Sequence, residues 1–261
     1  MKVMGILNLT PDSFYARSRV PSHEEAVLRA KKMIEDGAEI LDIGGESSRP
    51  GSDPVSPEEE IARIVPVIRE LKRAFPETIL SVDTYHSATI EAALMAGADI
   101  ANDITALADP AYAKIVSEAG APVILMHMQG EPKTMQENPH YDDVVEDVLD
   151  FLKERADRAL AAGIAKDRIM IDPGIGFGKT YEQNMELIRN IDRFHVLELP
   201  VLLAVSRKTF IGKALALPDP KDRLEGTMAV SAWAATNGIE MIRVHDVLEN
   251  TRIVRMMEEI L

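Results

Sequence analysis

The feature of this sequence that most constrains its fold is a short apolar run followed by an amphipathic stretch of helical period, repeated about eight times along 261 residues. Most of the apolar runs lack polar alternation, which is typical of parallel strands buried on both faces. The expected strands are Val3–Leu7, Ile40–Ile43, Ile79–Val82, Asp99–Ala101, Val123–Met126, Arg168–Ile171, Val201–Val205 and Met241–Val244.

The stretches between these runs predict helices over His23–Asp36, Pro57–Ala74, Ser87–Ala96, Pro110–Ala119, Asp142–Ala162, Glu182–Ile191, Arg223–Asn237 and Leu248–Ile260. A glycine follows five of them directly, in the left-handed position that ends many helices: Gly37, Gly97, Gly120, Gly163 and Gly238. Eight strand–helix units close a barrel of about 250 residues, whereas an open doubly wound sheet usually stops near five or six strands. We therefore predict an α/β fold, a (β/α)₈ TIM barrel, with residues 1–261 as a single domain and no linker.

The composition excludes several classes of protein. There are 29 Lys+Arg against 43 Asp+Glu, a net charge of −14, whereas a nucleic-acid-binding surface needs a basic face. No apolar run reaches the roughly 18 residues of a membrane span, and the apolar start Met1–Leu9 is too short for a signal peptide. The chain has no cysteine, which rules out disulfides and cysteine nucleophiles and suits the reducing cytoplasm. We expect a cytoplasmic enzyme with small-molecule substrates, binding neither nucleic acid nor membranes.

Polar residues follow every predicted strand, and in a barrel of this kind they meet at one mouth. The residues at these strand ends are Asn8, Gly44, Gly45, Glu46, Asp83, Thr84, Asn102, Asp103, His127, Asp172, Ser206, Arg207, Lys208, Arg243 and His245. Loops are polar in any protein, which explains any single member of this set. Asp83, Asn102 and Asp172, however, stand at the tips of apolar strands, where an unpaired polar group is costly. They are expected to share a ligand.

The charges of this ring indicate what the ligand is. Cationic residues gather in an otherwise acidic protein, namely Arg49, Arg207, Lys208, Arg243 and His245. Carboxylates beside an amide can accept hydrogen bonds from the N–H and NH₂ groups of an amino-pyrimidine. A cationic cluster is suited to a phosphate or diphosphate. The two sets together favour a flat nitrogen heterocycle with an anionic tail.

Two other patterns were weighed as sites. Residues 174–180 (GIGFGKT) are similar to a phosphate-binding P-loop, but position 173, where the first glycine is required, is Pro173. His127, His140 and Glu131 could ligate a metal, yet their spacing fits no helix-borne zinc motif. Neither pattern is therefore predicted to form a site.

Seven segments carry a resemblance to the dihydropteroate synthase family: 5–14 (GILNLTPDSF), 42–51 (DIGGESSRPG), 81–84 (SVDT), 102–104 (NDI), 172–178 (DPGIGFG), 206–208 (SRK) and 243–246 (RVHD). Each is short, but they occur in the family's order from Met4 to about Met257. The resemblance implies a TIM barrel, usually a homodimer, in an enzyme family targeted by sulfonamides. It further implies a transferase that joins 6-hydroxymethyl-7,8-dihydropterin diphosphate to 4-aminobenzoate, giving 7,8-dihydropteroate and diphosphate in folate biosynthesis.

The resemblance also implies roles for individual residues. The pterin would be held at its pyrimidine edge and carbonyl side, and packed on its faces, by Asp83, Asn102, Asp172, Lys208, Met126 and Phe177. Asn8 would ligate a Mg²⁺ cofactor together with the diphosphate. The aminobenzoate would lie near Ser48, Arg49, Pro50 and Ser206, and Arg207 is also expected to bind substrate. Catalysis would rest on Lys208, Arg243 and His245, the last two binding the diphosphate.

Three departures from the family pattern are visible. Tyr15-Ala16-Arg17-Ser18 stands where the family usually has Ser-Asp-Gly-Gly, so the loop acid and two glycines are missing. Ser48 replaces a common Thr, and Ala204 a frequent Gly. Two alternatives stay open here: a methyltransferase barrel that binds methyltetrahydrofolate, and a pterin-binding paralogue without activity. The first should lack the Ser-Arg-Lys and Arg-Val-His segments, and turnover separates the second.

Overall fold

The computed structural model describes residues 1–10, 23–47 and 51–261. The predictions made for Ser48, Arg49, Pro50 and the Tyr15–Ser18 segment lie outside the described residues. All other predicted site residues lie within them.

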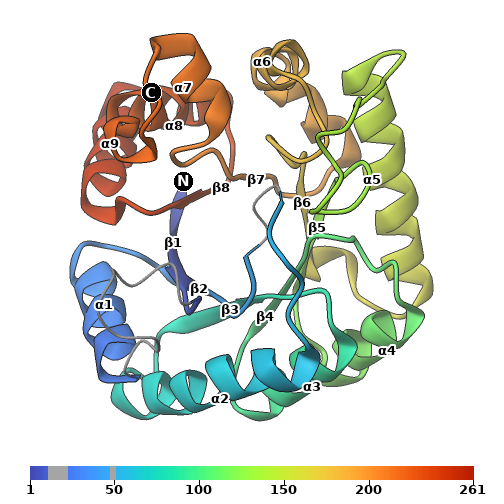
Figure 1. Cartoon of the computed structure of the whole chain (residues 1–261), viewed down its shortest axis with the longest axis vertical. Coiled ribbons are helices and arrows are strands. Elements are labelled where there is room, and N and C mark those ends of the chain that lie inside the picture. Colours follow the sequence, from blue (N-terminus) through green and yellow to red (C-terminus); the bar gives the residue numbers. More distant parts are fainter. Residues whose placement is uncertain (11–22, 48–50) are drawn as a thin grey trace.

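Eight parallel strands form the centre of the molecule (Figure 1). They are β1 (Lys2–Asn8), β2 (Ile40–Gly44), β3 (Ile79–Asp83), β4 (Ile100–Asp103), β5 (Val123–Met126), β6 (Ile169–Asp172), β7 (Leu202–Leu203) and β8 (Met241–Val244). Their order in the sheet is β6-β5-β4-β3-β2-β1-β8-β7. A parallel bridge between Ile171 and Val201 joins the two ends of this sheet, so the strands close on themselves. The predicted TIM barrel is confirmed.

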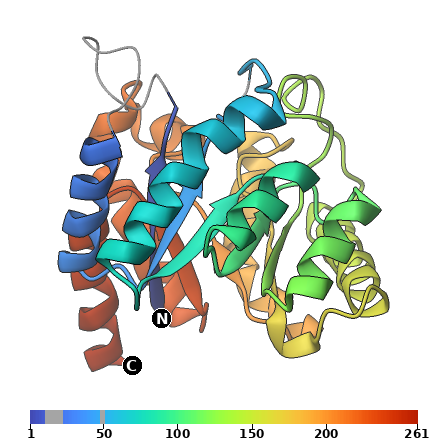
Figure 2. The ribbon, with the colours of Figure 1, turned by 90° about the horizontal axis from the view of Figure 1, so that it is seen from below.

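The helices surround the strands (Figures 1 and 2). They are α1 (His23–Glu35), α2 (Pro57–Ala74), α3 (Ser87–Met95), α4 (Pro110–Ala119), α5 (Val144–Ala161), α6 (Tyr181–Arg189), α7 (Thr209–Leu215), α8 (Leu224–Thr236) and α9 (Val247–Ile260). Short 3₁₀ segments η2 (Lys166–Arg168), η3 (Ile191–Leu197) and η4 (Pro220–Asp222) complete the described elements. Both termini lie at the same end of the barrel (Figure 2), where the N-terminal amine is 2.8 Å from the Glu258 carboxylate.

Local sequence signals account for where several helices begin and end. The Ser56 hydroxyl accepts the backbone N–H of Glu59, and Pro57 occupies the first turn of α2, where no N–H is needed. The five glycines predicted to end helices all have positive φ, from 61° at Gly120 to 110° at Gly97. The signals read from the sequence therefore operate in the fold.

Each strand separates two apolar layers, which is why the runs show no polar alternation. One small cluster consists of Met4, Ile40, Ile124, Leu202 and Met241, and the alternate residues of the same strands belong to a larger second cluster. Because side chains alternate across a strand, the small cluster fills the barrel and the large one lies under the helices. Continuing the inner face of β1 from Met4 leads to Ile6 and then Asn8, so the barrel interior becomes polar toward the strand ends.

Several elements have other bounds than expected. Five strands extend one or two residues further, so polar residues predicted to follow them lie within them: β1, β2, β3, β4 and β6 end at Asn8, Gly44, Asp83, Asp103 and Asp172. Strand β7 is only Leu202–Leu203, because the chain continues past it without ladder pairing. Helix α7 was not predicted, because its seven residues are too few to show a helical period. Among the described residues no helix is long and apolar enough to cross a bilayer.

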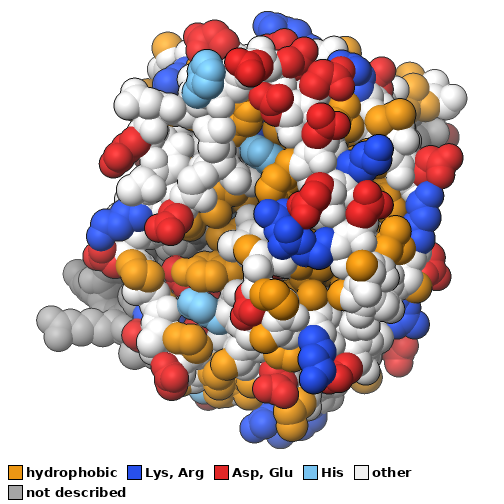
Figure 3. All heavy atoms as spheres, turned by 90° about the vertical axis from the view of Figure 1, so that its right-hand side faces the viewer, with side chains coloured by type: hydrophobic (Ala, Val, Ile, Leu, Met, Phe, Trp, Pro, Cys, Tyr) orange, Lys and Arg blue, Asp and Glu red, His pale blue; other side chains and the backbone are white. Residues whose placement is uncertain are grey.

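Charged side chains of both signs are interspersed on the face that carries α4 and α5 (Figure 3). This mixture accompanies the net charge of −14. Inside the barrel mouth, the positive charge of Arg243 is paired with the carboxylates of Asp42 and Asp83.

Candidate functional site

Pairing between neighbouring strands places the predicted polar residues at one level of the barrel. Asn8 of β1 is in register with Gly44 of β2, Gly44 with Asp83 of β3, and Asp83 with Asn102 of β4. Because these are register partners, their side chains project on the same side of the sheet. The strand ends thus form a continuous polar ring facing the barrel interior.

The centre of the ring is an arginine held by two carboxylates. Arg243 of β8 donates through Nε to Asp42 Oδ2 over 2.5 Å and through Nη2 to Asp83 Oδ2 over 2.7 Å. Asp42 is fully buried, and the Asp83 and Arg243 side chains are 13% and 16% exposed. These two ion pairs leave Nη1 of Arg243 outside both. The Arg243 charge, expected from the sequence to serve an anionic ligand, is already compensated within the protein.

Asp42 also accepts from the amide of Asn102, with Nδ2 at 3.2 Å from Oδ2. It lies two residues before the end of β2, where its side chain shares the inner face with Gly44. The sequence does not single out Asp42 as a site residue, because it sits inside an apolar run. An acid in a strand buried on both faces is the signal that could have found it, since a buried carboxylate requires partners.

The electrostatics of this group follow from burial and pairing. Burial raises the pKa of Asp83 to about 7, with Arg243 acting in the opposite direction. Burial disfavours the charge of Arg243, but Asp42 and Asp83 outweigh it and raise the pKa of its guanidinium. Arg243 is therefore a fixed cation, whereas Asp83 can change protonation near neutral pH.

A second part of the site joins β6 to the residue before α7. Burial raises the pKa of Asp172, and its Oδ1 accepts the backbone N–H of Gly174 over 2.7 Å. Lys208 donates to the Ile175 carbonyl, and its Nζ lies 4.7 Å from the centre of the Phe177 ring. Burial lowers the pKa of Lys208 to about 8, with Asp172 opposing this and Arg243 adding to it. Because their charges influence one another, Lys208, Asp172 and Arg243 belong to one electrostatic site.

The loop after β6 is anchored from behind by a buried lysine. Lys179 Nζ is 2.9 Å from His127 Nδ1 and donates to the carbonyls of Gly174 and Phe177, each over 2.9 Å. Burial lowers the pKa of Lys179 well below its usual value, and it lowers the pKa of His127 to about 2. Lys179, the lysine of the GIGFGKT segment, therefore binds carbonyl groups of its own loop. This agrees with the prediction that the segment is not a phosphate-binding P-loop.

The residues after β7 and β8 meet at the third part of the ring. Ser206 Oγ accepts the backbone N–H of His245 over 3.1 Å and lies 2.9 Å from its Nδ1. Arg207 donates to both carboxylate oxygens of Asp246, over 2.8 and 2.5 Å. Its φ of +58° is a strained conformation, fixed in part because its N–H donates to Thr227. Arg207 is therefore committed to Asp246.

Arg243 thus contacts Asp83 directly, and Asn102 joins the same group through Asp42. The charges of Asp172 and Lys208 influence each other and that of Arg243. Met126 is the register partner of Asp172, and Ser206 and His245 are in contact with each other. A cavity of about 530 Å³ also lies beside the site, and it is lined by Gln136, Pro139, Lys179, Thr180, Tyr181, Glu182, Lys213 and Ala214. None of the ring carboxylates lines it, so the ring geometry is the better guide to chemistry.

Residues 4–245 match a protein family described as pterin binding enzyme. Over 256 residues, the chain is 46% identical to the dihydropteroate synthase of Escherichia coli, covering 98% of this chain and 90% of that protein.

Solved structures give the same picture. A Yersinia pestis dihydropteroate synthase in complex with a sulfonamide drug superposes with a TM-score of 0.93 and 43% identity, over 99% of this chain and 93% of that one. A Xanthomonas albilineans dihydropteroate synthase with 4-aminobenzoic acid gives a TM-score of 0.92 and 41% identity, over 99% and 92% of the two chains.

Proposed function

We propose how the site works from the premise that this chain belongs to the dihydropteroate synthase family of pterin binding enzymes. It is a transferase that joins 6-hydroxymethyl-7,8-dihydropterin diphosphate to 4-aminobenzoate, giving 7,8-dihydropteroate and diphosphate in folate biosynthesis. The observation that carries the proposal is the buried group formed by Arg243, Asp83 and Asn102 at the barrel mouth, electrostatically coupled to Asp172 and Lys208.

The pterin is bound by the inner ring. Asp83 and Asp172 accept from the N–H and NH₂ groups of its pyrimidine edge, and Asn102 contributes its amide. Lys208 donates to the carbonyl side of the ring. Supporting this, burial raises the pKa of both aspartates, and hydrogen bonds from the N–H and NH₂ groups of a ligand would stabilise their charged form. Met126 and Phe177 pack against the faces of the heterocycle.

The residue at the end of β1 fits a Mg²⁺ cofactor. Asn8 offers a neutral amide oxygen, and a Cβ placed on Gly44 would lie 3.4 Å from it, so glycine keeps this space open. Mg²⁺ usually takes one or two protein oxygens and completes its shell with substrate phosphates and water. When bound, the ion neutralises charge that develops on the leaving diphosphate.

The chain's own residues meet the remaining demands of the reaction. An aromatic amine is largely unprotonated at neutral pH, so no strong general base is needed. The barrier is departure of the diphosphate from the methylene carbon, and the electron-rich pterin stabilises the cation that develops there. His245 and Arg243 stabilise the leaving charge, Arg243 through the Nη1 that its ion pairs leave over. Ser206, with Ser48, Arg49 and Pro50 outside the described residues, binds the aminobenzoate. Arg207, also expected to bind substrate, is paired with Asp246 and is given no direct role here.

The decisive experiment is turnover. The purified chain is incubated with the pterin diphosphate, Mg²⁺ and 4-aminobenzoate, and diphosphate release is measured with and without the amine. Release that depends on the amine is expected. If the chain binds the pterin but releases no diphosphate, it is a pterin-binding protein without activity, as the altered Tyr15–Ser18 segment would allow. If it does not bind the pterin, the proposal is contradicted.

A second experiment separates two roles of Arg243. If it acts on the leaving group, Arg243→Ala lowers kcat by about 10²–10³, the cost of losing one preorganised donor. If it only orients Asp83, KM for the pterin rises while kcat changes little. Arg193→Ala is the matched control, because this exposed arginine pairs with Glu146 on the surface; the change should leave both constants unchanged.

Three broader properties are also proposed. Residues 1–261 act as one pterin-binding domain, which the closed sheet supports. The protein is a homodimer, and the exposed apolar side chains Leu215 of α7 and Trp233 of α8 support a buried partner face. It works in the cytoplasm, which suits a chain without cysteine. Light scattering of the purified protein tests the dimer.

A further inference from the structure

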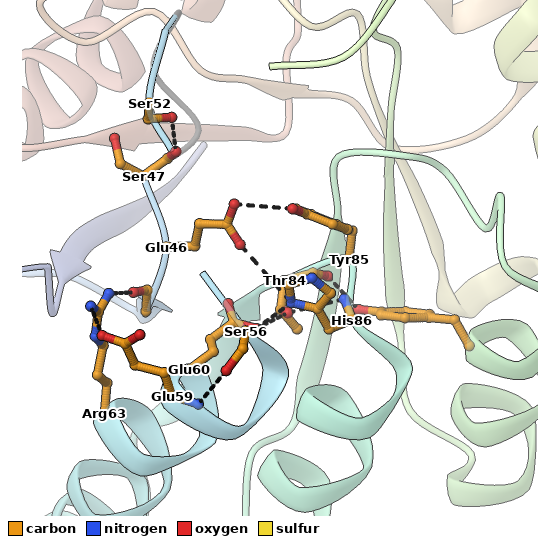
Figure 4. A network of polar contacts seen from close by, with 12 residues as sticks. Glu46, Ser47, Ser52, Ser56, Glu59, Glu60, Arg63, Thr84, Tyr85 and His86 are labelled. Atoms are coloured by element: carbon orange, nitrogen blue, oxygen red, sulfur yellow. Dashed lines mark hydrogen bonds and ion pairs between the residues drawn. The ribbon is translucent and has the colours of Figure 1, made fainter. Parts of the chain in front are cut away.

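A second polar cluster lies outside the pterin site, at the start of α2. It consists of Glu46 from the loop after β2, Glu60 from α2 and His86 from the loop after β3 (Figure 4). One ligand atom from each lies within 4.8 Å of the others. His86 Nδ1 is 3.0 Å from Glu60 Oε2 and 4.0 Å from Glu46 Oε2.

The two carboxylates of this cluster are buried without a permanent cation. The Glu60 side chain is 1% exposed and that of Glu46 is 10% exposed. In the described part of the chain, no lysine or arginine forms an ion pair with either, and Glu46 Oε2 has no hydrogen-bond partner. Two such acids side by side are costly unless a positive charge or a proton compensates them.

Neighbouring residues hold the three ligand groups in place. Tyr85 donates its hydroxyl to Glu46 Oε1 over 3.0 Å, and Thr84 donates to Glu60 Oε2 over 2.7 Å. Gly45 permits this approach, because a Cβ there would lie 2.8 Å from Glu60 Cγ. Hydrogen bonds of this kind orient the ligands of metal sites.

The orientation of His86 also fits a role as a ligand. It is the residue that precedes the first turn of α3, but its side chain makes no capping hydrogen bond to that helix. The imidazole is directed instead toward the two carboxylates (Figure 4). With 18% of its side chain exposed, it leaves a path from solvent to the cluster.

From this geometry we propose that Glu46, Glu60 and His86 bind a divalent transition-metal ion, with Zn²⁺ as the best match. A set of one imidazole nitrogen and two carboxylate oxygens suits Zn²⁺. In a tetrahedral zinc site, neighbouring ligand atoms lie about 3.3 Å from one another. The two distances from His86 Nδ1, 3.0 and 4.0 Å, lie on either side of that value, and all three ligand atoms lie within 4.8 Å of one another, so binding would draw them closer together. The ion ties the loop after β2 to α2 and the loop after β3. None of the three ligands is a residue assigned to substrate or to Mg²⁺ in the proposed function, on which this inference does not rest.

The proposal is tested on the full chain after removal of metals with a chelator. Zn²⁺ is titrated calorimetrically, and thermal unfolding is followed with and without it. One Zn²⁺ per chain is expected, with a raised Tm. Glu46→Gln and His86→Gln each weaken binding by about 10²-fold or more, since loss of even an outer hydrogen-bond partner costs 10–100-fold. Circular dichroism of each variant checks that it is folded. If one variant does not fold, the other still tests the proposal.

Two controls make the result specific. His140→Gln removes a histidine that also lies beside an acid, 3.7 Å from Asp142, but both side chains are exposed, so Zn²⁺ binding should be unchanged. Asn8→Ala should also retain Zn²⁺ binding. A wild-type chain that binds Zn²⁺ no more tightly than His86→Gln overturns the proposal, because a proton then suffices to compensate the two glutamates.

Discussion

Arg243 Nη2 lies 2.7 Å from Asp83 Oδ2, while its Nε contacts Asp42, so one guanidinium joins β8, β3 and β2 inside the barrel. The charge that prepares the site is thus also part of what holds the strands together. Under the proposed function, the same group serves both stability and substrate binding.

Asp42→Asn should cost stability out of proportion to its size. The change removes the charge of a fully buried aspartate from its pair with Arg243, which is 16% exposed, and breaking a buried pair costs about 3–5 kcal/mol. We expect a loss of about 3 kcal/mol in the free energy of unfolding, measured by urea denaturation. Asp53→Asn is the control, because Asp53 is 90% exposed and pairs with Lys133 at 3.4 Å, where an ion pair contributes less than about 1 kcal/mol. Equal losses in both variants would show that the Asp42 pair adds no stability.

The pH profile of kcat/KM for the pterin diphosphate should be bell-shaped. Asp83 has a pKa raised to about 7 by burial, and it must lose its proton to accept from the pterin, so kcat/KM rises through about pH 7. Lys208, with its pKa lowered to about 8, must keep its proton, so kcat/KM falls above that pH. The two limbs belong to the coupled group and are read as macroscopic values.

Asp83→Asn separates this profile from the titration of the substrate, whose terminal phosphate loses its last proton near pH 6, at about the value of other phosphate esters. The variant should lower kcat/KM by about tenfold to a hundredfold, the worth of one hydrogen bond to a charged group. Its remaining activity should lack the inflection near pH 7. An unchanged inflection would exclude Asp83 as its origin.

Much of the fold could be predicted because its signals are local. Helix-ending glycines, a capped helix start and apolar strands depend only on neighbouring residues, and the elements they predict are present in the described chain, with some bounds shifted. Helix α7 was not predicted, and β7 was predicted as Val201–Val205 but is only Leu202–Leu203, because segments of two to seven residues carry too little periodicity.

The positions of the candidate site residues could be predicted from the sequence, but their pairing could not. The positions of Asp83, Asn102 and Asp172 follow from the rule that strand ends share one mouth. That Arg243 is shared by Asp42 and Asp83, and that Lys179 is buried against His127, depends on side-chain geometry between strands far apart in sequence. No spacing in the chain encodes these contacts.

Gly174→Ala should be far more disruptive than Gly51→Ala. Both glycines have positive φ, 67° and 79°, so both substitutions incur backbone strain of about 1–2 kcal/mol. At Gly174 the new Cβ would also lie 1.8 Å from the His127 carbonyl, whereas at Gly51 nothing lies within 4 Å. We expect an added loss of about 1–3 kcal/mol at Gly174, the usual cost of overpacking, measured by urea denaturation. KM for the pterin should rise as well, because Gly174 N–H holds Asp172. Similar losses in both variants would mean that the loop yields without cost.

His127 should make the protein less stable as the pH falls. Burial lowers its pKa from 6.5 to about 2, so between these values the unfolded chain binds a proton that the folded chain does not. The free energy of unfolding therefore loses about 1.4 kcal/mol per pH unit below about pH 6.5 through this group.

Buried aspartates with raised pKa act in the opposite direction, so the wild type is compared with His127→Gln, which keeps those aspartates. The stability difference between the two should shrink by that amount per unit between about pH 6 and about pH 4. His140→Gln, at an exposed imidazole, should keep the wild-type slope. Parallel curves for the wild type and His127→Gln would show that His127 takes up its proton without unfolding the loop behind the pterin site.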